Sequence, residues 1–411
     1  MAVYSYTFKD PSGGIQKGTA EAESEEKLRA RFQEQGLEIV EISMIKKGKV
    51  AKSRGFGKVK LAKLSVFCRQ FSTMVDAGVS LVRCLDVLSR QTDDPKLKKI
   101  LLDLSERVEG GESLSRAMQR HPRTFNNLFI GLIRAGEVGG VLEESLQRLS
   151  QFLESDVALR RKVKAALTYP VLVMIAAVLI VAFLVTWIVP QFAELFRDIG
   201  LKDQDFPAMT KFLIDLSENV RTNGLVIIIT LIAIYVGWKL FTSTRFGRRV
   251  ADKIRLKVPV FGPLHHKVCL ARFSRTMGTL LTSGVPILQA LETVAGTVGN
   301  SILADAVLDA RARIREGDRI GDPLEESRQF PPMVVHMIGV GEESGSLDFM
   351  LQKIADFYES EVEATLQSLT AALEPILIVF LGFVVGFIVI AMFLPLIKVI
   401  EGLSAGEGFN D

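Results

Sequence analysis

Three long apolar stretches constrain this chain most. The stretches at 171–189 and 376–397 contain no charged residue, and the stretch at 225–241 contains only Lys239. Because a helix of roughly 20 apolar residues crosses about 30 Å of hydrocarbon, we predict that the first two span a membrane. The middle stretch is shorter and could be a buried helix of a soluble domain. Lys239 can extend to the headgroups, so we favour a third span.

Basic residues beside these stretches predict their orientation. Four Lys or Arg residues lie at 160–164, whereas only Arg197 and Lys202 closely follow the first stretch. Six lie at 245–257, after the second stretch, and two lie before it. Lys398 follows the third stretch and weakly favours the opposite orientation, but the earlier spans usually dominate orientation. We therefore predict a cytoplasmic N-terminus.

An internal duplication includes the first and third stretches. RQFSTMVDAGVSLVRCL from Arg69 aligns with RTMGTLLTSGVPILQAL from Arg275, an offset of 206 that becomes 205 after one residue is lost. On the second offset Pro170 matches Pro375, each at the edge of a predicted span. Two equivalent domains that enter the membrane in the same direction need one return span, which the unmatched middle stretch supplies.

Each copy has helical periodicity. Leu142, Leu146 and Leu149 recur on one helical face, and Gly- or Pro-containing breaks divide 61–168 into about six helices. We predict an antiparallel bundle whose last helix continues from Leu142 into the membrane. Residues 1–45 instead combine a hairpin, a helix capped by Ser24 and an alternating strand, which predicts a small α+β module.

The predicted fold class is a mainly α membrane protein with two repeated cytoplasmic six-helix bundles, three transmembrane helices and a small N-terminal α+β module. The predicted boundaries are 1–45 for the α+β module, 46–60 for a basic linker, 61–168 for the first bundle, 171–189 for the first span, 190–224 for an external, periplasmic loop, 225–241 for the second span, 242–374 for the second bundle, 376–397 for the third span and 398–411 for an external tail. The basic linker is either a solvated tether or a segment that contacts anionic headgroups.

Each copy contains a Gly-Glu-x-x-Gly-x-Leu motif, in RAGEVGGVLEESL and GVGEESGSLDFML. The first glycine can end one helix, the second can support a tight turn, and the glutamate falls near the start of the next helix, where a carboxylate is stabilising. The alternative is a partner-contact surface on an exposed loop. The candidate residues are Gly136, Glu137, Gly140, Gly341, Glu342 and Gly345.

The sequence offers no catalytic, cofactor-binding or metal-binding set, so we predict that the chain is not an enzyme. Cys68 aligns with Ser274 and Cys84 with Ala290, so the polar candidates of one copy are missing from the other. The HHKVC segment lacks a second cluster that would complete a zinc site. There is no P-loop motif. The net charge of +3 does not suggest nucleic-acid binding, and three cysteines do not form a disulfide framework.

A G-x-x-x-G motif, Gly382 and Gly386, lies in the third predicted span. This spacing permits close helix packing, either with another span of the same chain or with a second protomer.

These motifs, in this order, resemble the inner-membrane platform proteins of type IV pili and type II secretion, and the pilus branch is favoured. FCRQFSTMVDAGVSL, ARFSRTMGTLLTSGVPIL, ALTYPVLV and ALEPILIV carry the resemblance together with the two glutamate motifs. It implies a bacterial inner-membrane platform that contacts a cytoplasmic hexameric ATPase, pilins or pseudopilins and other inner-membrane assembly proteins. A homo-oligomer is expected. Glu374 stands where the first copy has Tyr169, so equal roles for the two copies are not implied.

Two other classes remain open on residues alone. A small-solute transporter would also use repeats, but its coupling ions need polar residues, and the predicted spans contain no Asp, Glu, Arg or His. A membrane scaffold for an unrelated cytoplasmic complex is compatible with the same sequence.

Overall fold

The computed structural model describes the backbone of residues 2–9, 15–22, 38–44, 59–198 and 206–404. It divides the chain into two compact units, residues 1–58 and 59–411.

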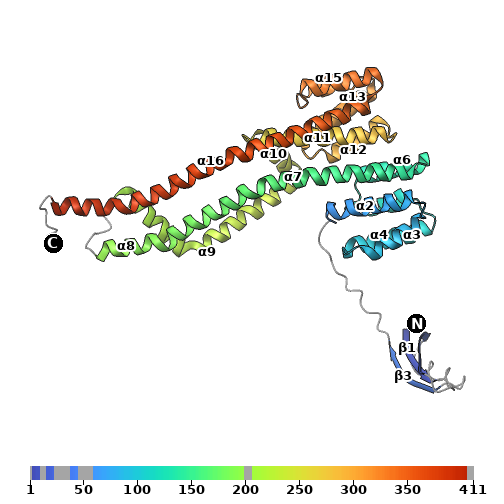
Figure 1. Ribbon diagram of the computed structural model, residues 1–411, viewed down its shortest axis with the longest axis horizontal. Coiled ribbons are helices and arrows are strands. Elements are labelled where there is room, and N and C mark those ends of the chain that lie inside the picture. The colour runs from blue at the N-terminus through green and yellow to red at the C-terminus, as the bar shows by residue number, and fades with distance from the viewer. Residues whose placement is uncertain (1, 10–14, 23–37, 45–58, 199–205, 405–411) are drawn as a thin grey trace. The chain divides into compact units, whose positions relative to one another are not determined.

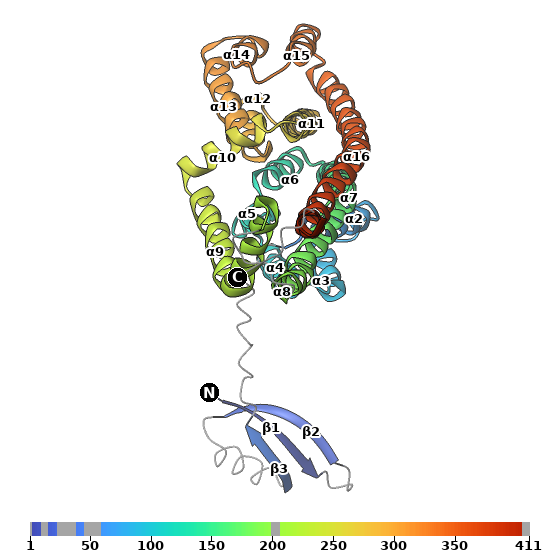
Figure 2. The same ribbon diagram turned by 90° about the vertical axis from the view of Figure 1, so that its left-hand side faces the viewer.

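The first unit contains a three-stranded antiparallel sheet in the order β2-β1-β3 (Figure 2). β1 (Ala2–Lys9) pairs with β2 (Ile15–Ala22) on one side and with β3 (Glu38–Met44) on the other. The β1–β2 pair is the predicted hairpin, with Ala2 opposite Ala22. The helix predicted from Ser24 lies outside the described residues.

Two helical bundles make up most of the second unit. The first contains six helices: α2 (Leu61–Asp76), α3 (Leu81–Gln91), α4 (Pro95–Glu109), α5 (Leu114–Gln119), α6 (Asn127–Gly139) and α7 (Leu142–Phe183). The second contains α10 (Arg245–Lys257), α11 (Phe261–Thr282), α12 (Ile287–Thr297), α13 (Ser301–Glu316), α14 (Gly321–Glu326), α15 (Pro332–Ser344) and α16 (Leu347–Ser404). The helices from α11 to α16 repeat those from α2 to α7, and no described helix of the first copy corresponds to α10.

Local capping explains several helix boundaries. Asp94 accepts hydrogen bonds from the backbone N–H groups of Lys96 (2.9 Å) and Leu97 (3.2 Å), and Pro95 occupies the first position of α4. Pro fits there because that position has no intrahelical N–H partner. Asn300 caps α13 by accepting from the N–H of Ile302 at 2.9 Å.

The two bundles share one continuous apolar core. Phe125 and its repeat partner Phe330 are both buried. At the contact between copies, Leu280 Cδ2 of α11 lies 3.9 Å from the position of a side chain built on Gly131 of α6. Arg148 of α7 donates a hydrogen bond to the carbonyl of Thr282 in the other copy. The copies therefore pack as one body.

Three helices of the described residues are long and apolar enough to cross a membrane. α7 and α16 each run from their bundle directly into an apolar segment (Figure 1). The third of these helices, α9 (Ala208–Ser243), packs through its first turns against α16. Neither Pro170 nor Pro375 ends its helix. α7 passes through a π-helical turn, η1 (Leu184–Ile188), into α8 (Val189–Asp198).

The predicted external loop over 190–224 is largely helical, which corrects the sequence interpretation. α8 covers its start, and α9 begins at Ala208, well before the apolar stretch. Residues Thr210, Leu213 and Ser217 are buried at helical spacing against α8 and α16, while the charged residues occupy the other face. The charged residues on the exposed face of this amphipathic helix explain why the sequence predicted a loop.

Candidate functional site

The second glycine of each repeated motif forms a turn between helices. Gly140 has φ +69° and Gly345 has φ +67°, and each caps the helix before it in the left-handed conformation. The next helices begin two residues later, at Leu142 and Leu347. Glycine adopts this conformation without the steric cost that other residues meet.

The sequence predicted that the first glycine of each motif ends a helix, and the structure shows that it does not. Gly136 lies inside α6 and Gly341 inside α15, one turn before each helix ends. A Cβ built on Gly136 would lie 2.7 Å from Ser145 Cβ, and one on Gly341 would lie 2.9 Å from Leu347 Cα. These glycines therefore permit close approach of the following long helix.

The motif glutamates bind the start of an earlier helix, whereas the sequence predicted the next one. Glu137 accepts from the N–H of Ser115 at the start of α5, with both oxygens at 3.3 Å. Glu342 accepts from the N–H of Ile320, immediately before α14, at 2.9 Å. A carboxylate near a helix N-terminus interacts favourably with the helix dipole and unpaired N–H groups. Each glutamate thus fastens a six-residue helix to the bundle.

We expect Glu342→Ala to lower the free energy of unfolding by about 1–2 kcal/mol, because the N–H of Ile320 loses its acceptor. Glu343→Ala is the matched control, since its exposed ion pair with Arg319 is worth about 0–1 kcal/mol. Chemical denaturation of the purified chain measures both. Equal losses from the two variants would contradict the capping role of Glu342.

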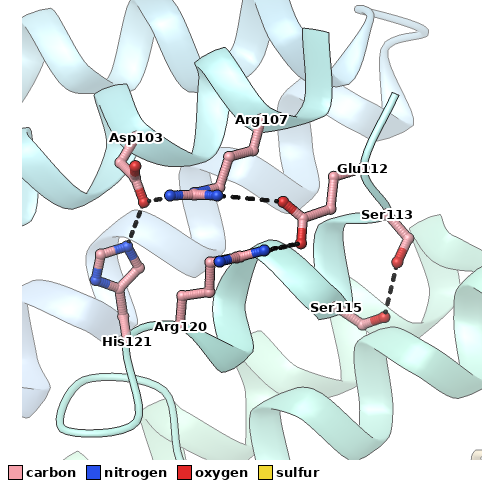
Figure 3. A network of polar contacts seen from close by, with 7 residues as sticks. All are labelled: Asp103, Arg107, Glu112, Ser113, Ser115, Arg120 and His121. Atoms are coloured by element: carbon pink, nitrogen blue, oxygen red, sulfur yellow. Dashed lines mark hydrogen bonds and ion pairs between the residues drawn. The ribbon is translucent and has the colours of Figure 1, made fainter. Parts of the chain in front are cut away.

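A polar network stabilises the same region of the first bundle (Figure 3). Arg107 Nε donates to Asp103 at 3.0 Å, and its Nη1 to Glu112 at 3.4 Å. Arg120 also donates to Glu112, and His121 Nε2 lies 2.7 Å from Asp103. The network ties the end of α4 to both ends of α5.

The second copy retains part of this network. Arg313, at an offset of 206 from Arg107, donates to Asp318 at 2.7 Å and also bonds Glu326. The Arg107–Glu112 pair of the first copy is therefore repeated as Arg313–Asp318, whereas Glu326 has the opposite charge to Arg120 at the equivalent position.

Another repeated ion pair joins the first long helix of each copy to its last. Arg69 of α2 pairs with Glu154 of α7. In the second copy Arg275 of α11 bonds Glu359 of α16 at 2.9 Å and Asp356 at 2.7 Å. The shared arginines noted in the sequence thus hold equivalent helices together.

Stability should fall in acid through these carboxylates. Hydrogen bonding by Arg69 lowers the pKa of Glu154, and hydrogen bonding by Arg107 lowers the pKa of Asp103. A carboxylate whose pKa is lower in the folded state stabilises it fully above its unfolded pKa, and this stabilisation is lost as the pH falls through the folded pKa. Arg69→Gln combined with Arg107→Gln removes both partners. Between about pH 5 and pH 3, the thermal midpoint of this double variant should therefore fall less than that of wild type. Curves parallel to wild type would contradict this; exposed Arg161→Gln is the control.

The two motif turns lie at the tips of the bundles, far from the apolar segments. From Leu142 to the apolar stretch, α7 rises about 40 Å. At the first tip Val138 is 85% exposed and Val141 is 49% exposed. Their repeat partners, Glu343 and Ser346, are polar. The first turn therefore exposes two apolar side chains, whereas the second has polar residues at the same positions.

No residue that the structure describes packs closely against the G-x-x-x-G motif. Gly382 and Gly386 lie in α16, and a Cβ built on either would meet no described atom within 4 Å. Packing against another span of the same chain is therefore not observed among the described residues.

The buried cysteines are unreactive in character. Burial raises the pKa of Cys269 to about 12, and it also raises the pKa of Cys68. His265 Nε2 lies 3.8 Å from Cys269 Sγ, while His266 bonds the carbonyl of Gln329. Among the residues described, no three His, Cys, Asp or Glu side chains are placed to hold a metal ion.

The fold defines a membrane protein with a duplicated helical domain, each copy continuous with a membrane-length helix. The family model of type II secretion system protein F matches residues 67–190 and 273–395, the two copies. The N-terminal domain model of the same protein matches residues 1–43. The chain therefore belongs to the type II secretion system protein F family.

Relatives with pilus names are similar over almost the whole chain. The type IV pilus assembly protein PilC of Thermus thermophilus is 43% identical over 98% of this chain and 100% of its own length. That of Myxococcus xanthus is 42% identical, over 96% and 94%. Type II secretion system protein F of Vibrio cholerae is 32% identical, over 97% and 98%. The resemblance seen in the sequence is thus confirmed.

Proposed function

We propose that this protein is the inner-membrane platform of a type IV pilus assembly machine, which couples a cytoplasmic ATPase to the insertion or removal of pilin subunits. The observation that carries the proposal is the continuity of α7 and α16 from bundle tip to apolar segment. A displacement applied at a tip would move the membrane end of the same helix, because that helix is continuous. The two copies would move together, because they share one core.

In this mechanism the chain transmits work and the partner supplies it. ATP hydrolysis occurs in the ATPase, which contacts the cytoplasmic tips. The membrane ends of the long helices then act on pilins in the bilayer. The basic residues at 160–164 and 245–257 support a cytoplasmic position for both bundles and for the N-terminus. Homo-oligomerisation around the ATPase axis completes the proposal, with Gly382 and Gly386 as a candidate contact between protomers.

The pilus branch is favoured by the higher identity to proteins named for pilus assembly, 43% against 32%. A platform of a type II secretion system is the second candidate, favoured by the family that the two bundles match. Its partners would be pseudopilins and a secretion ATPase.

Affinity purification from native membranes tests the proposal. The tagged chain should recover a P-loop ATPase and pilins, and mass spectrometry identifies them. A tagged, unrelated inner-membrane protein of similar abundance is the control. Recovery of pseudopilins would favour the secretion branch, whereas recovery of neither an ATPase nor pilin-like proteins would support a scaffold for another complex.

A further inference from the structure

A groove of about 470 Å³ lies where the first bundle's last helix approaches the membrane. One wall is the segment of α7 around Val163, and the other is the corner between α10 and α11. Lys164 stands seven residues before the apolar stretch, which corresponds to about 10 Å of helix. The groove therefore lies near the depth of the lipid headgroups.

The floor of the groove is apolar, with Val163, Phe261, Leu264 and Val268 among its lining residues. At the corner, Val260 has φ +71°, a conformation that is unusual for a β-branched residue. Val260 and Phe261 are 55% and 43% exposed. This corner presents apolar side chains outward, as expected of a segment that contacts lipid.

The rim of the groove is basic. Arg160, Lys164, Arg255 and Arg272 line it, and none of the described lining residues is acidic. Lys164 makes no ion pair with any residue that the structure describes. Arg272 Nε is buried and has no hydrogen-bond partner within the described residues.

Two carboxylates behind the rim neutralise only part of this charge. Asp156 bonds Arg160 at 2.9 Å and lies 3.5 Å from Arg272 Nε. Asp252 lies 3.1 Å from Arg255 Nη1. Four cations against two carboxylates leave an excess positive charge at the mouth of an apolar groove.

α10 extends this surface next to the membrane. It begins at Arg245, two residues after the membrane-length helix α9 ends, and carries six Lys or Arg residues. Its exposed apolar residues, Phe246 and Ile254, are eight positions apart, a spacing that keeps them toward one side of a helix. A basic amphipathic helix in this position is typical of an interfacial helix on anionic lipid.

We propose that this groove binds one anionic phospholipid, with the phosphate at Lys164, Arg255 and Arg272 and an acyl chain on the apolar floor. Charge complementarity selects the headgroup, and the apolar floor beside α7 selects a lipid over a free anion. The site does not depend on which assembly machine the protein serves.

Native mass spectrometry of the full chain in detergent, titrated with phosphatidylglycerol or phosphatidylcholine, tests this site. Wild type should prefer phosphatidylglycerol, and Lys164→Gln with Arg255→Gln should weaken its binding about tenfold. The matched control is Arg161→Gln with Arg248→Gln, which removes one cation from each of the same helices outside the groove. Equal binding by the two double variants would overturn the proposal.

Two further measurements distinguish a lipid whose acyl chain lies in the groove from a headgroup or anion that only the basic residues bind. Val268→Phe fills the floor while keeping every cation, so it should also weaken phosphatidylglycerol binding. Lys164→Gln alone covers the case in which loss of Arg255 disturbs folding, because Lys164 is exposed. Unchanged binding by Val268→Phe, or full displacement of the lipid by inorganic phosphate, would show an anion site without a lipid seat and overturn the proposal.

Discussion

Replacing Gly136 by alanine is expected to destabilise the protein by about 1–2 kcal/mol, although alanine is the better helix former by about 1 kcal/mol. The added Cβ would lie 2.5 Å from Ser145 Oγ, 2.7 Å from Ser145 Cβ and 3.0 Å from Leu142 Cα. Leu142 Cα is a backbone atom and Ser145 Cβ is bonded directly to the backbone, so neither can move away by a side-chain rotation. The helices α6 and α7 must therefore separate. Gly136→Val should cost about 3 kcal/mol or more.

Gly131→Ala is the matched control in the same helix. Its nearest neighbour, Leu280 Cδ2, lies at 3.9 Å, an ordinary contact, so this substitution should be neutral or stabilising by up to about 1 kcal/mol. Thermal unfolding of the purified full chain measures both midpoints. If Gly136→Ala and Gly131→Ala shift the midpoint alike, the close approach of α6 and α7 is not what requires glycine.

Charging the apolar tip is expected to abolish filament assembly without unfolding the protein. Val138 and Val141 are exposed at the first tip, so Val138→Glu with Val141→Glu should have effects on stability within about 0.5 kcal/mol. If the ATPase contacts this tip, two buried unpaired carboxylates at the contact would cost several kcal/mol of binding. Recovery of the ATPase with the chain, and surface filaments, should then fall together.

The matched control applies the same change elsewhere on the first bundle. Val66 and Leu102 are also exposed, and Val66→Glu with Leu102→Glu adds the same charge away from the tip. Filament loss in both double variants would indicate a general charge effect. Normal filaments and normal ATPase recovery in the tip variant would show that the contact surface lies elsewhere.

Much of the architecture follows from local sequence patterns. The duplication, the apolar stretches and the glycine breaks predict the six helices of the first bundle and the long helices that leave both bundles. Gly140 and Gly345 are recognisable because a left-handed helix end favours glycine strongly, and this preference depends only on the local backbone.

The site contacts needed the tertiary structure. Gly136 and Glu137 are adjacent in the sequence, yet one faces α7 and the other reaches back to Ser115 of α5. Which neighbour a helical residue meets depends on how α5, α6 and α7 pack, and residue spacing along one helix does not specify this. The sequence does not reveal the helix from Ala208, because its buried face includes Thr210 and Ser217 and charged residues occupy its other face.

Hydrogen bonds explain why those polar residues are buried. Ser217 Oγ donates to the carbonyl of Val185 at 2.6 Å, in the π-helical turn η1, and Thr210 Oγ1 donates to the carbonyl of Ala391. A π-helical turn departs from the regular hydrogen-bond pattern of an α-helix, and Ser217 bonds a carbonyl within this turn. Hydropathy alone counts both residues as unfavourable in a buried position, so it hides this packing.

Deleting the gene in its native host and counting surface filaments by electron microscopy tests the platform proposal most directly. We predict that filaments are lost and that a plasmid copy of the wild-type gene restores them. Normal filaments with failed export of folded proteins would place the chain in a secretion system. Normal filaments together with intact export would contradict the platform function.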